Sequence, residues 1–232
     1  MEHWIDFAKG PLFAFTFLIM TLGLSRLVVI QTYSIVRGKG RRLGNAPWRR
    51  IFAEAATWVV PVRHLIPETR LFSAVSYLFH IGALVVPLLL ASHIALWERL
   101  LNVSLPEIGY GLADFLTLCT IASVLVLLGF RIFSRQLRST SQPSDYVLLI
   151  VILVPFASGY VAMHPEWNPF PWAVMMLVHV LSAELLFVLI PFTKLAHIVV
   201  FFFDRISVLH WQLRPGAGDK VAEVLYGEEA RV

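Results

Sequence analysis

Long apolar runs separated by short polar stretches dominate the pattern of the chain. Five of these runs are long enough to be membrane-crossing helices, which need roughly 20 residues. Their predicted limits are about 11–36, 71–97, 109–133, 146–163 and 172–203. The pattern predicts an all-α polytopic bundle of five transmembrane helices, forming a single membrane-integral domain over residues 1–232. The sequence contains no internal repeat and no low-complexity region.

Composition favours a membrane protein over a soluble domain, because 58% of the 232 residues are hydrophobic and only 15% are charged. The acidic N-terminus lacks the basic stretch and cleavage site of a signal peptide, so we expect the first span to be retained. The single cysteine, Cys119, lies inside an apolar run. A single cysteine, with no CxxCH motif, excludes a disulfide, an iron–sulfur cluster of the chain's own and a covalently attached haem.

The net charge of +4 comes from basic residues in the loops between apolar runs. The loops that begin at Arg37 and Phe130 are strongly basic, whereas the N-terminus and residues 98–114 and 164–171 carry few positive charges. By the positive-inside rule, this distribution predicts an N-terminus outside the membrane and a cytoplasmic C-terminus. An odd number of spans agrees with that orientation. The charge therefore reports orientation, and we expect contact with membrane lipid and no nucleic-acid binding.

Residues 47–68, between the first two spans, combine an apolar face with a basic one and are interrupted by Pro61 and Pro67. This pattern predicts an interfacial segment on the cytoplasmic surface. The segment either lies on lipid headgroups or receives a partner subunit.

The fifth span carries His179 and His197, which are eighteen residues apart. In an unbroken helix eighteen residues make five whole turns, so both imidazoles would point from one face, about 27 Å apart along the axis. That distance is close to the thickness of a bilayer core. Histidine nitrogen is an axial ligand of haem iron, so the pair predicts two haems at two depths of the membrane. The alternative is that each histidine bonds to a neighbouring helix.

The second span contributes His80 and His93. Because spans two and five run in opposite directions, we expect His80 to pair with His197 and His93 with His179. A spacing of thirteen residues leaves the two rings of span two about 140° apart on an ideal helix. Pro87 lies between them, and a kink or local unwinding there can absorb part of that mismatch. Gly82 faces away from His80 and indicates close packing against another helix.

Other polar residues near or within the spans leave two interpretations each. Arg26 either extends to the cytoplasmic interface or meets a buried anion such as a haem propionate. Glu184 either passes protons to or from a quinone, or stays neutral in a subunit contact. Asp114 either ends in water or lies beside a quinone headgroup. Ser158 and Gly159 in span four would allow close helix packing.

Three stretches carry a family resemblance. They are FHIG around His80, the run FRIFSRQLRSTSQPSDYVLL from Phe130, and the H(x17)H spacing with PFTKLAHI in span five. Together they resemble the gamma subunit of respiratory nitrate reductase and its wider family of membrane dihaem cytochromes b. The resemblance covers nearly the whole chain, with the same five spans and orientation. His80, His179 and His197 match position by position.

Three departures set the chain apart within that family. The second histidine of span two, His93, follows the first by thirteen residues instead of ten, and the loop 164–171 is much shorter. The sequence has no lysine between Lys39 and Lys194, so a lysine near the quinol site of span three has no counterpart. The chain is therefore more similar to the branch that serves heterodisulfide-reductase-like and other iron–sulfur or multihaem complexes.

The resemblance implies an electron-transfer subunit of a quinol-linked oxidoreductase complex. Four histidines from spans two and five would hold the iron of two b-type haems, with Arg26 in a similar leucine–arginine setting. The subunit would carry electrons between the quinone pool and an iron–sulfur or multihaem partner, docked at the cytoplasmic face. Its place would be the cytoplasmic membrane of a bacterium or archaeon. The alternative within the family is a true nitrate reductase gamma subunit.

Two other classes are a transporter and a haem-free membrane anchor. In a transporter Arg26, Glu184 and the histidines would line a polar path. We expect no broken helix pairs of the kind that many transporters use, and this expectation counts against that class.

Overall fold

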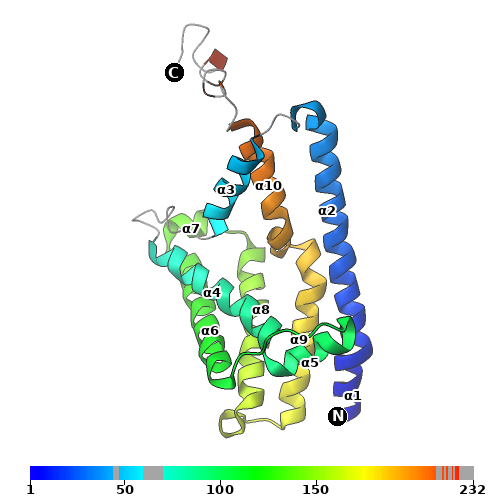
Figure 1. The fold of residues 1–232 in the computed structure, drawn as a ribbon. Coiled ribbons are helices and arrows are strands. Elements are labelled where there is room, and N and C mark those ends of the chain that lie inside the picture. The colour runs from blue at the N-terminus through cyan, green and yellow to red at the C-terminus, as the bar shows by residue number, and fades with distance from the viewer. Residues whose placement is uncertain are drawn as a thin grey trace. The chain divides into compact units, whose positions relative to one another are not determined.

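The computed structural model describes residues 1–43, 47–59 and 70–212, and the separate positions 216, 218, 221, 223 and 224. Every regular element within these residues is a helix, as Figure 1 shows, and a single isolated bridge joins Leu90 to Ile108. Five helices of the described part are long and apolar enough to cross a membrane. They are Glu2–Arg37, Arg70–Leu89, Tyr110–Phe133, Pro143–Met163 and Trp172–Phe192. The predicted all-α fold with five membrane spans is confirmed.

The chain divides into two compact units. The first combines Met1–Ile19 with Ile66–Val188, and the second combines Met20–Leu65 with Leu189–Val232. The first unit holds most of the span helices, together with His80, His93 and His179. The second holds the rest of the first span and the helices that follow the fifth. The orientation of the termini relative to a membrane stays a prediction.

The first span starts earlier than the sequence predicts. A short helix, α1 (Glu2–Phe7), continues through a π-helical turn (Ala8–Leu12) into α2 (Phe13–Leu43). Pro11 lies inside the π-helical turn, where its missing N–H group disturbs the regular hydrogen-bond ladder. Ile5 and Ala8 are buried, so this extension belongs to the packed part of the first unit.

The second span is broken where the sequence predicts a kink. Helix α4 (Arg70–Leu89) contains Pro87 and ends just after it, Leu90 is extended, and α5 (Ala91–Leu101) begins a separate helix. The backbone carbonyl groups freed at this break find new donors. Trp97 donates from Nε1 to the Pro87 carbonyl at 3.1 Å, and the backbone N–H of Ile108 donates to the Leu89 carbonyl at 2.9 Å. These bonds satisfy backbone groups that cannot stay unpaired away from water.

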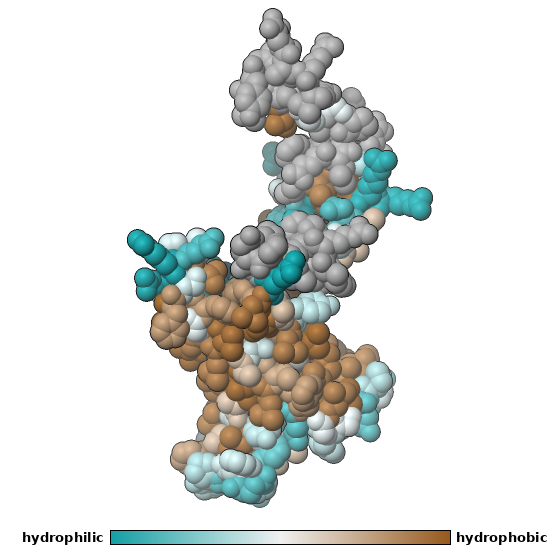
Figure 2. All heavy atoms as spheres, turned by 90° about the vertical axis from the view of Figure 1, so that its left-hand side faces the viewer, coloured by the Kyte–Doolittle hydropathy of each residue, from teal (hydrophilic) through white to brown (hydrophobic). Residues whose placement is uncertain are grey.

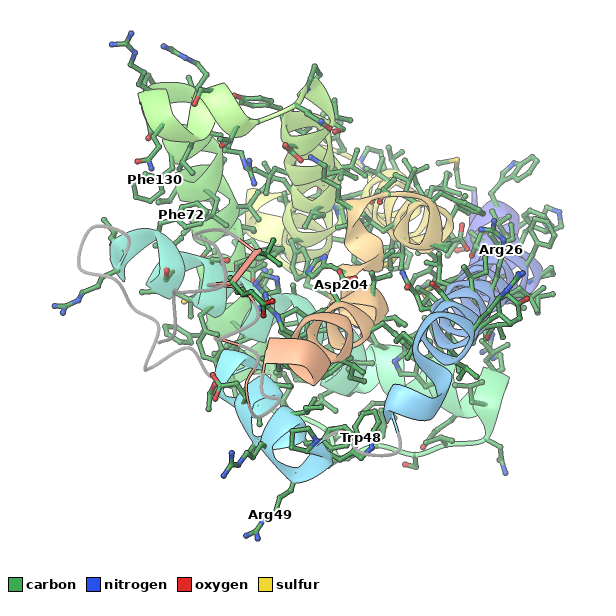
Figure 3. All side chains as sticks on the ribbon, turned by 90° about the horizontal axis from the view of Figure 1, so that it is seen from above. Arg26, Trp48, Arg49, Phe72, Phe130 and Asp204 are labelled. Atoms are coloured by element: carbon green, nitrogen blue, oxygen red, sulfur yellow. The ribbon has the colours of Figure 1, made fainter. Side chains whose placement is uncertain are left out.

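Helices α4, α6 (Tyr110–Phe133) and α8 (Pro143–Met163) form the core of the first unit. A Cβ atom at Gly82 would collide with the Thr120 hydroxyl and lie 2.9 Å from the Leu116 carbonyl oxygen. The predicted close packing at Gly82 is therefore confirmed. Phe72 of α4 and Phe130 of α6 face each other with ring centroids 5.9 Å apart, and both are labelled in Figure 3.

Hydroxyl groups inside this core bond within their own helices. Thr117 and Thr120 donate to the carbonyls of Ala113 and Leu116, each at 2.7 Å, and Ser158 donates to the Val154 carbonyl at 2.6 Å. Each bond reaches back four residues, so the polar group needs no partner on another helix. Small polar side chains can then line a close helix–helix contact without leaving a donor unsatisfied.

The fifth span is not one helix, and the prediction of an unbroken segment over 172–203 is wrong. Helix α9 covers Trp172–Leu189, two short 3₁₀ turns follow at Ile190–Phe192 and Lys194–Ala196, and α10 begins at His197 and ends at Gln212. Pro191 is the physical reason, because it cannot donate the bond that would continue the helix. Thr193 is extended, and its hydroxyl donates to the Leu189 carbonyl at 2.8 Å in place of the lost backbone bond.

The interfacial segment is described only in part. Helix α3 (Trp48–Val59) packs on α10 within the second unit, with Ile51, Ala55 and Leu209 buried together. Arg49 projects away from α3 in Figure 3, so this helix has the apolar and basic sides that the sequence predicts. The rest of the predicted segment, including Pro61 and Pro67, lies outside the described residues.

Figure 2 shows a broad area of apolar residues on one face of the described part, bordered by hydrophilic residues. Large apolar side chains on the span helices are exposed in the isolated chain, among them Phe115, Leu125, Ile150 and Leu185. A face of this kind is compatible with contact with lipid hydrocarbon.

Candidate functional site

The His179 imidazole is seated against α8. Its Nδ1 atom lies 2.7 Å from the Pro155 carbonyl oxygen, on a different span from its own. Gly159 completes the seat, because a Cβ atom there would lie 2.7 Å from Cε1 and 2.8 Å from Nδ1 of His179. The close packing that the sequence predicts at Gly159 is confirmed, and its neighbour is an imidazole.

The His93 imidazole is held by the break in the second span. Its Nδ1 atom lies 3.2 Å from the carbonyl oxygen of Val86, seven residues earlier and on the other side of Leu90. An unbroken helix could not bring these two groups together, because bonds within it reach back only four residues. The break near Pro87 therefore both turns α5 and supplies the acceptor that orients His93.

The structure brings His93 and His179 together, as the antiparallel pairing predicts. Their ring centroids are 5.9 Å apart and the ring planes differ by only 12°. A carbonyl oxygen only accepts hydrogen bonds, so Nδ1 carries the hydrogen in each neutral ring and Nε2 keeps a lone pair. No described residue is recorded as bonding to either Nε2 atom. The pair therefore consists of two parallel imidazole rings, each oriented by its Nδ1–carbonyl contact. The lone pair on each Nε2 atom can bind a metal ion.

This spacing suits two ligands of one metal centre. Two imidazoles that bind a metal from opposite sides through bonds of about 2 Å have ring centroids about 6 Å apart. An Nδ1–H bond to a carbonyl is the arrangement that fixes the tautomer and orientation of a metal-binding histidine. The described residues contain no group of three or more histidine, cysteine, aspartate or glutamate side chains that could hold a metal ion. A haem needs only two nitrogen ligands from the protein, and the separation and parallel planes of this pair are compatible with that requirement.

The second predicted pair, His80 and His197, is divided between the two units. His80 lies on α4 with Nδ1 2.7 Å from the Ser76 carbonyl oxygen, and His197 opens α10 with Nδ1 2.9 Å from the Lys194 carbonyl oxygen. Each ring therefore has the same anchored Nδ1 atom as the first pair. The pairing of His80 with His197 stays a prediction. The argument that His179 and His197 share one helical face is wrong, because the helix ends between them.

Arg26 lies on α2 in the second unit and is exposed. It makes no recorded ion pair or hydrogen bond with the described residues, and Figure 3 shows it apart from Asp204 of α10. The described contacts of Arg26 therefore do not distinguish between its two predicted roles, at the interface or beside a propionate.

Glu184 of α9 is 3% exposed, and both of its carboxylate oxygens lack a hydrogen-bond partner among the described residues. It shares a helix face with Phe187, whose ring packs against Phe13, Phe17 and Trp97 at centroid distances of 5.7 to 6.3 Å. A buried carboxyl group in such surroundings costs free energy unless it is protonated or finds a partner. Both interpretations of Glu184 therefore stay open.

Asp114 has a partner that the sequence does not predict. Its Oδ2 atom lies 3.4 Å from Nε2 of His164, and the two side chains are 44% and 19% exposed. His164 also has its Nδ1 atom 2.8 Å from the Tyr160 carbonyl oxygen, and its ring stacks on the Tyr160 ring at 4.1 Å. The start of α6 and the end of α8 thus carry a carboxylate–imidazole pair that can take up or release a proton.

Lys9 is the other group that sequence reasoning missed. Its Nζ atom lies over the Trp172 ring, 5.9 Å from the ring centroid, and Trp172 shares one face of α9 with His179. In the sequence Lys9 is only one charge near the start of an apolar run. The disturbed helix at Pro11 is the signal that could have drawn attention to it, since π-helical turns occur frequently at functional sites.

Fold and site together define the class: an all-α, multi-pass membrane protein with a parallel, carbonyl-anchored imidazole pair between broken helices. The chain is 31% identical over 208 residues to a protein of Nitratidesulfovibrio vulgaris (strain Hildenborough), covering 86% of this chain and 89% of the relative. The chain therefore belongs to the same family as that protein, whose name states no activity. No protein-family model matches the chain, and no solved structure matches it.

Proposed function

We propose that this protein is a dihaem cytochrome b, the membrane subunit of a respiratory complex. It would transfer electrons between the quinone pool and an iron–sulfur or multihaem partner subunit. The observation that carries the proposal is the His93–His179 pair, with parallel rings 5.9 Å apart and both Nδ1 atoms at backbone carbonyls. Two b-type haems, when bound, would supply one-electron transfer between the two sides of the membrane.

The chain's own residues would orient the axial ligands. Val86 and Pro155 offer carbonyl oxygens that hold His93 and His179 as neutral rings with Nε2 free to bind iron. His80 and His197 would form the second pair, and their anchored Nδ1 atoms support that role. Arg26 would meet a haem propionate of that second pair.

Quinone chemistry also requires a group that handles protons, because a quinol releases two protons as it gives up two electrons. The Asp114–His164 pair is suited to accept one of them. His164 follows Gly159 by five residues, about 7.5 Å along the axis of α8. The proton-accepting pair and the seat of His179 thus lie near the same end of one helix.

One observation favours a second candidate function, a transporter. Spans two and five are both interrupted, at Leu90 and at residues 190–196, so the expectation of no broken helix pairs is wrong. Paired broken helices are typical of many transporters. In transporters, however, unwound carbonyl groups face the substrate. Here the described carbonyls at the first break accept from His93, Trp97 and Ile108, which favours the dihaem proposal.

The purified protein tests the proposal by absorption spectroscopy. We expect a Soret band in the oxidised protein and a sharp α band after anaerobic addition of a soluble menaquinol analogue. A protein without a Soret band would contradict the haem assignment and favour the transporter or a haem-free anchor. A protein whose haems are reduced by dithionite but never by the quinol would contradict the link to the quinone pool alone.

Replacing Gly159 with alanine should weaken haem binding at the His93–His179 pair. The added Cβ atom would lie within 2.8 Å of two ring atoms, so His179 must move and its bond to Pro155 must lengthen. Loss of an orienting bond of this kind typically lowers metal affinity by about ten- to a hundredfold. Haem content and the rate of haem loss to apomyoglobin measure the effect.

The matched control is Gly129→Ala in α6, where a Cβ atom meets nothing within 4 Å. It should retain the haem content of the unchanged protein. Equal haem content in both alanine variants would show that the seat of His179 does not matter for the cofactor.

A further inference from the structure

We propose that Lys9 binds a propionate carboxylate of the haem held by His93 and His179, and so raises the reduction potential of that haem. The inference rests on the proposed function. It assigns a residue at the very start of the first span to a cofactor whose axial ligands come from spans two and five.

The first line of support is the position of the Lys9 ammonium group. It lies 5.9 Å from the centroid of the Trp172 ring, over the first turn of α9. Trp172 precedes His179 by seven residues, about two helical turns, so the two side chains share one face of α9. Helical side chains tilt towards the N-terminus of their helix, so His179 leans towards the turn that Lys9 covers.

The second line of support is that Lys9 has no anionic partner among the residues that the structure describes. No carboxylate among the described residues forms a recorded ion pair with it, although Asp6 is only three residues away. Its side chain is partly buried, and its ammonium group lies over the Trp172 ring, on the face of α9 that carries His179. A partly buried cation without a counter-ion, beside a site for a group with two carboxylates, has the charge that such a group needs.

The third line of support is the local backbone. Lys9 lies in the π-helical turn Ala8–Leu12, which also contains Pro11. A π-helical turn changes the direction in which the following side chains project, and such turns occur frequently at functional sites. Ala8 is 1% exposed, so the π-helical turn packs against the rest of the first unit and the backbone of Lys9 is held in place.

Arg26 is the cation that the sequence indicates for this role, but it belongs to the second unit. Lys9 belongs to the same unit as His93 and His179. The two cations could therefore serve the two haems separately, with Lys9 as the partner of the His93–His179 haem.

The experiment compares redox titrations of the purified protein with those of four variants. Lys9→Met keeps the apolar stem over Trp172 and removes the charge, Lys9→Gln keeps a polar end, and Lys9→Arg keeps the charge. Arg99→Gln is the matched control, because it removes an exposed cation from the helix that carries His93. A His93→Ala protein shows which midpoint potential belongs to the other haem.

In Lys9→Met and Lys9→Gln we expect the reduction equilibrium of the His93–His179 haem to fall by about tenfold, or 59 mV for one electron. Without the ammonium group the propionate charge is no longer compensated, and it then favours the oxidised, more positive iron. The other haem should keep its potential, and Lys9→Arg and Arg99→Gln should match the unchanged protein.

An unchanged potential in either neutral variant would overturn the inference, and Lys9 would then serve only at the membrane interface or with a lipid phosphate. An equal shift in Arg99→Gln would overturn it too, because the effect would be a general one of surface charge. A wild-type protein that contains no haem would contradict the proposed function instead. The failure of one proposal can therefore be told from the failure of the other.

Discussion

A His93→Ala protein should retain one of two b haems and lose the other. If the His93–His179 pair holds a haem as proposed, alanine would remove one of its two histidine ligands and leave only His179. A haem held by one remaining imidazole is bound far more weakly, so this site should be essentially empty after purification. His179→Ala should give the same result, whereas His80→Ala should empty the other site. The pyridine haemochrome assay, expressed per folded chain, measures all three variants.

His164→Ala is the control for this prediction. His164 has the same carbonyl-anchored Nδ1 atom as the four predicted ligands, but its Nε2 atom faces Asp114. We expect His164→Ala to keep both haems. The ligand assignment would be wrong if His93→Ala kept two haems at full occupancy, or if His164→Ala lost one.

The Gly82→Ala substitution should strongly destabilise the first unit. The new Cβ atom would collide with the Thr120 hydroxyl and approach the Leu116 carbonyl oxygen to 2.9 Å, at a close contact between α4 and α6. Relief requires the helices to separate or Thr120 to rotate away from its bond to Leu116. Overpacking of this kind typically costs about 1–3 kcal/mol in the free energy of unfolding. Thermal unfolding in detergent, followed by circular dichroism, measures the loss.

A second substitution tests whether collision with the Thr120 hydroxyl causes the loss of stability. Thr120→Ala removes the hydroxyl that the new methyl group would meet, so the double variant should recover part of the lost stability. Gly129→Ala, in the same helix as Thr120 but with open space around it, should unfold at the temperature of the unchanged protein. A Gly82→Ala protein as stable as Gly129→Ala would contradict the proposed helix contact.

The number and type of the span helices could be predicted because length and hydrophobicity decide them. The break in the second span could also be predicted, because Pro87 must remove a bond wherever it lies in a helix. The backbone geometry that results from this break could not be predicted from the sequence. Leu90 becomes extended, and the carbonyl of Val86 becomes the acceptor that orients His93. That bond depends on the direction in which α5 leaves the break.

The fifth span shows where periodicity misled the prediction. The eighteen-residue spacing of His179 and His197 has a simple meaning only in an unbroken helix, and Pro191 lies between them. The sequence contained this signal, but the apolar run on both sides of Pro191 hid it. The second haem pair now rests on the anchored rings of His80 and His197 and on the family resemblance, not on a shared helix face.

The other features that the sequence did not predict depend on contacts between residues far apart in the chain. Asp114 and His164 are fifty residues apart, and Lys9 is more than 160 residues from Trp172. Neither pair has a local pattern, because the packing of the helices alone brings them together. Gly159 was predicted as a packing position, yet only the structure identifies an imidazole as its neighbour.

The haem content of the unchanged, purified protein tests the central claim most directly. A pyridine haemochrome assay with a redox titration should give two b haems per chain with two separate midpoint potentials. That result would agree with two bis-histidine sites in one subunit. One haem per chain would contradict the second site, and a chain without haem would contradict the proposed cytochrome as a whole.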